Sequence, residues 1–101
     1  ARPAISVSSA SIGRNEEGVP VPVITAQNSS TAHGYLSRGR LRIVQRDASG
    51  QEIFASELSG PEIQQSLGYG LVGGGQTRTV TLPVPLPASE GALTVGFTPD
   101  S

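Results

Sequence analysis

The strongest constraint on the fold of this chain is a strict alternation that begins just after three consecutive glycines. In the stretch LGYGLVGGGQTRTVTL (residues 67–82), threonines occupy positions 77, 79 and 81, and Arg78, Val80 and Leu82 share the opposite parity. A period of two with β-branched residues predicts a strand with two unlike faces. The glycines before it permit backbone angles that other residues resist, which predicts a sharp turn into that strand. The stretch holds no nucleophile–base pair and no metal ligands, so it favours a structural or interaction domain over an enzyme.

Similar short alternating runs recur along the chain, with turn-forming residues between them. The chain has 101 residues, the size of one small domain, and its 13 glycines and 8 prolines are spread along it. Only 36% of the residues are hydrophobic and 4% are aromatic, so the core must be thin and aliphatic, which suits two packed sheets. We therefore predict an all-β fold: an immunoglobulin-like β-sandwich of about six to seven strands with one short helical turn, in a single domain spanning residues 1–101.

The alternation and the turn residues locate the expected elements. Strands are expected at residues 4–12, 19–28, 35–46, 51–58, 77–82 and 92–98. Because Pro20 and Pro22 cannot donate ladder hydrogen bonds, the strand at residues 19–28 should begin at a sheet edge. Residues 83–87 should form another edge-type segment. DASG (residues 47–50) predicts a hairpin turn. In SGPEIQQSLG (residues 59–68), a capping residue, a proline in the first turn and a closing glycine predict a helix of two turns at most.

Charge and composition narrow the classes of partner. The net charge is −1, which gives no reason to expect nucleic acid or an anionic membrane as a partner. The absence of cysteine excludes disulfides and zinc–thiolate sites. No apolar run approaches the ~20 residues needed to span a bilayer, so no membrane insertion is expected. The chain also lacks methionine, which predicts a processed protein or an excised domain.

An arginine stripe is the candidate partner-binding site. Arg38, Arg40 and Arg42 share one parity of the expected third strand, which would place three charges on one face at intervals of roughly 7 Å. The stripe suits an acidic partner or a contact between domains. It equally suits a solvated outer face that discourages edge-to-edge aggregation.

Other candidate residues favour structural roles. His33 is the single histidine and has no second ligand or triad partner nearby in the sequence. The glycines at 73–75 lack the lysine and the following helix of a phosphate-binding loop, so they predict only a turn. Tyr69, between two glycines, is expected to pack over the end of the sandwich, with exposure for contact as the alternative. No catalytic, metal-binding or cofactor-binding residue is predicted, and the chain is not expected to be an enzyme.

Several segments carry a resemblance to a known family. NSSTAHGYLSRGRLRIV (residues 28–44) is an asparagine-containing loop that leads into a long basic strand. DASGQEI (residues 47–53) and LGYGLVGGGQTRTVTLPVPLP (residues 67–87) follow it, and Arg2-Pro3 opens the chain just before an alternating strand. Together they resemble the C-terminal domain of the periplasmic pilus assembly chaperones of the chaperone–usher pathway, in its archaic branch. The resemblance covers nearly the whole chain.

That resemblance implies a function and a set of partners. Chaperones of this family bind unfolded pilus subunits in the bacterial periplasm, lend them a missing strand by β-strand addition, and deliver them to an outer-membrane usher. The donated strand and the basic anchoring residues belong to the family's N-terminal domain, and no part of this chain matches them. The implied partners are therefore the subunits and the usher, through the full-length chaperone, and the chaperone's own N-terminal domain, which the gene is expected to encode upstream.

A second class stays open, an accessory or carbohydrate-binding β-sandwich domain of a secreted bacterial protein. Sugar-binding faces usually offer exposed aromatic platforms with acidic or amide partners. The chain has only Tyr35, Phe54, Tyr69 and Phe97, and most of these are expected to be buried.

Overall fold

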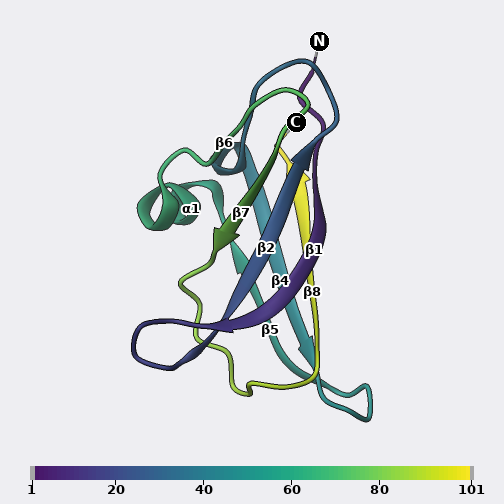
Figure 1. Ribbon diagram of the computed structural model, residues 1–101, viewed down its shortest axis with the longest axis vertical. Helices are drawn as coiled ribbons and strands as arrows, with labels where there is room; N and C mark the ends of the chain where they lie inside the picture. The colour runs from purple at the N-terminus through teal and green to yellow at the C-terminus, as the bar shows by residue number, and fades with distance from the viewer. Residues whose placement is uncertain (1, 101) are drawn as a thin grey trace.

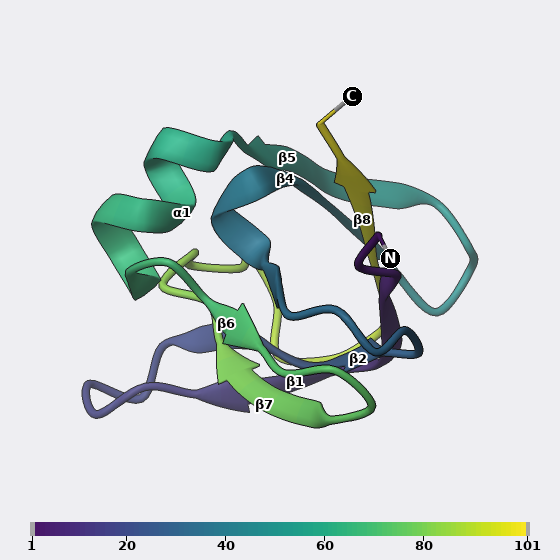
Figure 2. The same ribbon diagram turned by 90° about the horizontal axis from the view of Figure 1, so that it is seen from above.

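Two three-stranded antiparallel sheets face each other across an aliphatic core (Figures 1 and 2). The computed structural model describes residues 2–100 and measures 41 × 26 × 21 Å. One sheet has the strand order β1-β2-β7, and the other has the order β5-β4-β8. The bounds of these six strands are Ile5–Arg14 (β1), Pro20–Asn28 (β2), Gly39–Arg46 (β4), Glu52–Leu58 (β5), Thr77–Thr81 (β7) and Ala92–Pro99 (β8). The predicted all-β sandwich is confirmed.

Three smaller elements complete the fold. The two-residue strands β3 (Gly34–Tyr35) and β6 (Leu71–Val72) pair with each other at the end of the sandwich where both termini lie (Figure 1). A 3₁₀ turn, η1 (Leu36–Arg38), joins β3 to β4, and helix α1 (Gly60–Leu67) flanks the two layers on one side (Figure 2).

The core is built from alternate residues of the facing strands. Ile24 and Ala26 of β2 and Leu41 and Ile43 of β4 belong to one core cluster, and all four are fully buried. Val80, Val95 and residues from the connecting segments close the remaining space. This is the period-two pattern of a strand with one face turned inward.

One buried polar residue interrupts the aliphatic face of β4. Gln45 takes a core position and is fully buried. Its side-chain Nε2 donates hydrogen bonds to the carbonyl oxygens of Ala88 (2.9 Å) and Glu90 (3.1 Å). A buried amide needs such partners, and here they tie the irregular segment before β8 to the central strand.

The third predicted strand is not continuous, and this corrects the expectation for residues 35–46. The turn η1 interrupts it and drives Leu36 into the core, where it is fully buried. The regular strand resumes at Gly39, where β4 lies so close to β8 that a side chain would collide with the Phe97 ring and lie 2.5 Å from the Thr98 carbonyl oxygen. The residues before Gly39 therefore do not share the face of those after it.

The proline-rich start of β2 lies in a central strand, which corrects its predicted position at a sheet edge. The carbonyl oxygens of Pro20 and Pro22 accept hydrogen bonds from the amides of Leu86 and Leu82, both at 2.9 Å. Residues 83–87 run here beyond the end of β7 without forming a strand. Prolines are tolerated because this irregular neighbour needs no donor from them.

Helix α1 is set by local chemistry, as predicted. Ser59 Oγ accepts a hydrogen bond from the Glu62 amide (3.3 Å), and the Glu62 carboxylate accepts one from the Ser59 amide (3.1 Å), which forms a capping box. Gly68 closes the helix with a φ of 77°, and its amide donates to the Gln64 carbonyl oxygen at 2.9 Å. Ile63 turns inward and is fully buried.

Candidate functional site

The structure divides the predicted arginine stripe. Arg40 and Arg42 lie on the outer face of β4, exposed, and Arg46 continues their row. Arg38 lies in η1 instead, away from this row, because the 3₁₀ turn breaks the two-residue period. We call the outer face of the β5-β4-β8 sheet, with Arg40, Arg42 and Arg46, the arginine face.

Charges on the arginine face are only partly compensated. Arg40 forms an ion pair with Glu57 of β5 at 3.6 Å, and both side chains are about half exposed (55% and 46%). Arg46 donates a hydrogen bond to the Gly50 carbonyl oxygen in the hairpin turn, at 3.3 Å. Arg42 forms no ion pair with any residue between 2 and 100. An exposed pair such as Arg40–Glu57 contributes little to stability, so little free energy is lost when a partner displaces it. The basic side chains of the face are therefore available to a partner.

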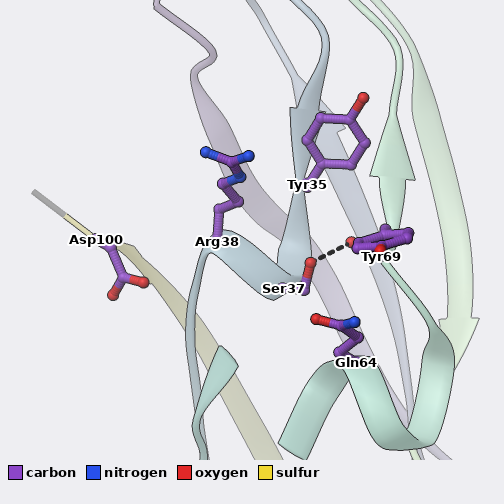
Figure 3. A pocket seen from close by; sticks show the side chains of 6 residues that line it. All are labelled: Tyr35, Ser37, Arg38, Gln64, Tyr69 and Asp100. Atoms are coloured by element: carbon purple, nitrogen blue, oxygen red, sulfur yellow. Dashed lines mark hydrogen bonds between the residues drawn. The ribbon is translucent and has the colours of Figure 1, made fainter. Parts of the chain in front are cut away.

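Arg38 lines a hollow of about 530 Å³ at the end of the sandwich where both termini lie. The other residues around this hollow are Tyr35, Ser37, Gln64, Tyr69 and Asp100 (Figure 3). A second hollow, of about 640 Å³, shares Tyr35, Arg38 and Asp100 with the first. Its further walls are Pro3, Ile5, His33, Gly34, Phe97 and Pro99. Segments from both ends of the chain and from its middle therefore meet here.

Two tyrosines dominate this surface. The rings of Tyr35 and Tyr69 lie edge to face, with centroids 6.4 Å apart and planes at 75°. Tyr69 is 65% exposed, so the expectation that it packs over the sandwich end is wrong. None of the four aromatic side chains is fully buried, which also corrects the expectation that most of them are. The expectation for Tyr69 came from its position between two glycines. Those glycines shape the turn, but they have no side chains that could cover the tyrosine ring.

The backbone beneath the tyrosines is fixed by hydrogen bonds. The Oγ of Ser37 donates to the Tyr69 carbonyl oxygen at 2.9 Å (Figure 3). The Ser37 amide donates to the same oxygen at 3.2 Å. Tyr35 is paired with Leu71 in the β3–β6 ladder. Gly70 adopts a φ of 67°, and a side chain there would lie 2.8 Å from Leu36 Cβ. The aromatic pair is therefore presented on a backbone with little room to change.

Exposed large hydrophobic side chains concentrate in this region. Among residues 2–100 they are Tyr35, Tyr69, Leu71 and Ile53, and only Ile53 lies elsewhere, on β5. Exposed apolar side chains beside polar ones are typical of a contact surface. We call the surface formed by Tyr35, Arg38, Tyr69, Leu71 and Asp100 the tyrosine end.

Asn28 holds the loops of the tyrosine end together. Its side chain is fully buried, and Oδ1 accepts hydrogen bonds from the Ala4 amide (3.2 Å) and from the amide and Oγ of Ser30 (3.1 and 2.8 Å). Its Nδ2 donates to the carbonyl oxygens of Ala32 (2.7 Å) and Val72 (3.0 Å). One amide thus joins the N-terminal segment, the following loop and β6.

His33 and the three glycines belong to the same support. His33 Nδ1 accepts a hydrogen bond from the Gly74 amide at 3.2 Å, and the Gly75 amide donates to the Asn28 carbonyl oxygen at 2.9 Å. A side chain at Gly74 would press on the Thr31 backbone, which explains the glycine there. The turn at residues 73–75 therefore packs against the loop that follows Asn28.

The described part of the chain, residues 2–100, contains no group of three or more histidine, cysteine or acidic side chains placed to hold a metal ion. No helix in that range is both long and apolar enough to cross a bilayer. Comparison of the chain with protein-family models, with curated proteins and with solved structures finds no match.

Proposed function

We propose that this β-sandwich is the non-catalytic C-terminal domain of a periplasmic chaperone that assists the folding of pilus subunits and their delivery to an outer-membrane usher. Donor-strand complementation would be performed by an N-terminal domain that precedes it. Its partners would be that domain, and the subunits and usher through the full-length chaperone.

The observation that carries the proposal is the position of the tyrosine end. Pro3, in the first residues of the chain, forms part of the wall of the second hollow. A domain attached before residue 1 would therefore lie close to Tyr35, Arg38 and Asp100. An exposed aromatic pair on a fixed backbone suits a contact with that domain or with a bound subunit.

The resemblance to the chaperone family supports the same conclusion. Its first segment begins at Asn28, and Asn28 is the residue that bonds the Ala4 amide to the loops of the tyrosine end. An asparagine at this point has a structural reason, since it fixes the direction in which the chain enters the domain.

The first test is the sequence encoded immediately before residue 1. An upstream immunoglobulin-like domain is expected there, whereas a signal peptide joined directly to residue 1 would contradict the proposal.

The second test uses the full-length chaperone in a strain that assembles the pilus. Tyr69→Ser with Leu71→Ser should reduce the amount of subunit that co-purifies with the chaperone and the number of assembled pili. Ile53→Ser is the matched control, because Ile53 is also an exposed apolar residue but lies on β5. Equal subunit recovery and pilus number in wild type and the double variant would remove the tyrosine end from the proposal.

A carbohydrate-binding accessory domain is the second candidate, favoured by the exposed tyrosines beside Gln64 and Asp100. The edge-to-face rings give no flat two-ring platform for a sugar to stack on. Titration with a panel of neutral and acidic oligosaccharides distinguishes the candidates: shifts of the Tyr35 and Tyr69 NMR signals that saturate would support the carbohydrate-binding class.

A further inference from the structure

Gly96 lies on the arginine face, and no feature of the fold requires a glycine at this position. Six glycines of the chain have a positive φ: Gly18, Gly50, Gly68, Gly70, Gly75 and Gly91. At six others a side chain would come closer than 3.0 Å to another atom: Gly13, Gly34, Gly39, Gly60, Gly73 and Gly74. Gly96 has neither constraint, since nothing lies within 4 Å of where its Cβ would be.

A glycine within a strand lowers stability relative to alanine, because glycine loses more backbone freedom on folding. Where the fold does not require it, such a glycine often marks a place where a ligand or another backbone approaches closely. Gly96 is in β8, directly opposite Arg42 of β4 in the register, and both residues face outward. The Arg42 side chain does not cover the space above Gly96, which is therefore open to an incoming chain.

The neighbouring charges favour an acidic occupant. Arg40 and Arg42 stand on β4 along one side of this space, and Arg42 has no ion-pair partner among residues 2–100. Thr98 and Thr94 flank Gly96 on the outer face of β8 and add no opposing charge. Two acidic residues lie across β4 from this space, on β5: Glu57 is directly opposite Arg42 and pairs with Arg40, and Glu52 is opposite Arg46. They would repel a dense polyanion that covered the whole face, and a ligand carboxylate at Arg40 would share that guanidinium with Glu57.

The spacing of the arginines favours an extended peptide. Alternate residues of a strand are roughly 7 Å apart on one face, and this holds both for Arg40 and Arg42 and for the side chains of an extended ligand. Guanidinium groups bind carboxylates through paired, charge-assisted hydrogen bonds. We propose that the strip above Gly96, bordered by Arg40 and Arg42, binds an extended acidic segment of a partner protein, with carboxylates at alternate residues reaching the two arginines. This site stands apart from the tyrosine end and from the chaperone proposal.

The probe is a fluorescent ten-residue peptide in which glutamate alternates with threonine, compared with the same peptide carrying glutamine. The 101-residue chain should bind the glutamate peptide, and binding should shift the amide NMR signals of residues 40–44 and 94–98. Its affinity for the glutamine peptide should be lower by roughly tenfold or more. Raising the salt concentration should weaken binding, since the contacts are exposed.

Three substitutions separate the site from general charge attraction. Arg42→Gln should weaken glutamate-peptide binding roughly tenfold, whereas Arg14→Gln, which removes the same charge from the other sheet, should change it less than about twofold. Gly96→Val should weaken binding to a similar extent as Arg42→Gln while leaving the melting temperature unchanged or raised, because the valine enters open space.

Several results would overturn the proposal. These are the absence of Arg42-dependent binding up to about 1 mM peptide, an equal loss with Arg14→Gln and Arg42→Gln, and unchanged affinity in Gly96→Val. Tighter binding of a DNA duplex or of vesicles with anionic lipid, in competition with the peptide, would assign the face to a different class of partner. None of these outcomes depends on pilus assembly, so the chaperone proposal stands or fails separately.

Discussion

The tyrosine end and the arginine face are built in opposite ways. The arginine face comes from one central strand, β4, whose alternate residues project to one side. The tyrosine end joins residues as far apart in the chain as Tyr35, Tyr69 and Asp100. The first surface depends on local periodicity and presents long, exposed side chains. The second depends on contacts between distant segments and presents aromatic rings on a fixed backbone.

This difference predicts unequal responses to mutation. A change on the arginine face alters charge and leaves the packing of the sandwich in place. A change beneath the tyrosine end removes contacts that hold several loops together, so it affects stability as well as binding.

The largest effect is expected from Asn28→Ala. The substitution removes five side-chain hydrogen bonds, one of them to the buried Val72 carbonyl oxygen and the other four, including the one from the Ala4 amide, half-buried. The free energy of unfolding, measured by urea denaturation, should fall by about 3 kcal/mol or more. Asn15→Ala is the control: Asn15 Oδ1 also accepts two backbone bonds, but in an exposed turn, and the loss there should stay below about 1 kcal/mol. Equal losses would mean that the tyrosine end has no special support.

A pair of glycine substitutions compares the two regions directly. Gly39→Ala places a methyl group against the Phe97 ring and the Thr98 carbonyl, at the junction of η1 and β4, and should cost about 2 kcal/mol. Gly96→Ala, on the arginine face, meets open space and should stabilise the chain by about 0.5 kcal/mol. Thermal unfolding of both variants measures the difference. A destabilised Gly96→Ala would show that this glycine serves the fold after all.

A smaller effect is expected at helix α1, which contributes Gln64 to the wall of the first hollow, beside the tyrosine end. Ser59→Ala removes the N-cap and should lower the free energy of unfolding by about 1 kcal/mol. Ser66→Ala, in the same helix and exposed, should leave stability unchanged or slightly raised because alanine favours the helix. Urea denaturation of the two variants side by side is the measurement, and equal midpoints would contradict the role of the cap.

The smallest effects concern pH, through one carboxylate in helix α1 and one in the turn after β4. Hydrogen bonds from the backbone and then the side chain of Ser59 hold the pKa of Glu62 below its ordinary value of 4.5. In the turn after β4, hydrogen bonds from the Ser49 side chain and the Gln51 backbone hold the pKa of Asp47 below 3.8. A lowered carboxyl pKa stabilises the folded state above the unfolded value, and this stabilisation is lost as the pH falls through the folded value.

Stability should therefore decline slightly below about pH 4.5 through Glu62 and below about pH 3.8 through Asp47. Glu62→Gln should remove the first part of the decline and Asp47→Asn the second, in urea midpoints measured from pH 7 to pH 3. NMR titration of the two carboxyl groups gives an independent check: a value at or above the ordinary one for either group would contradict the assignment.

Much of the fold follows from local patterns in the sequence. The alternation in residues 40–46 predicted a strand with Arg40 and Arg42 on its outer face, because successive side chains of a strand point to opposite faces. The capping residues at 59–68 and the DASG turn predicted α1 and the β4–β5 hairpin, since their hydrogen bonds join residues only a few positions apart. For these elements the sequence alone was sufficient.

The tyrosine end was decided by tertiary structure. The two-residue period predicted Arg38 on the same face as the other arginines, but the packing of Leu36 into the core and the closeness of Gly39 to β8 bend the chain. Arg38 therefore lines the same hollow as Tyr35 and Asp100. The roles of Asn28 and Tyr69 likewise depend on residues more than thirty positions away, such as Val72 and Ser37. Periodicity reports the environment of one strand, whereas a contact between distant segments exists only once the whole chain has folded.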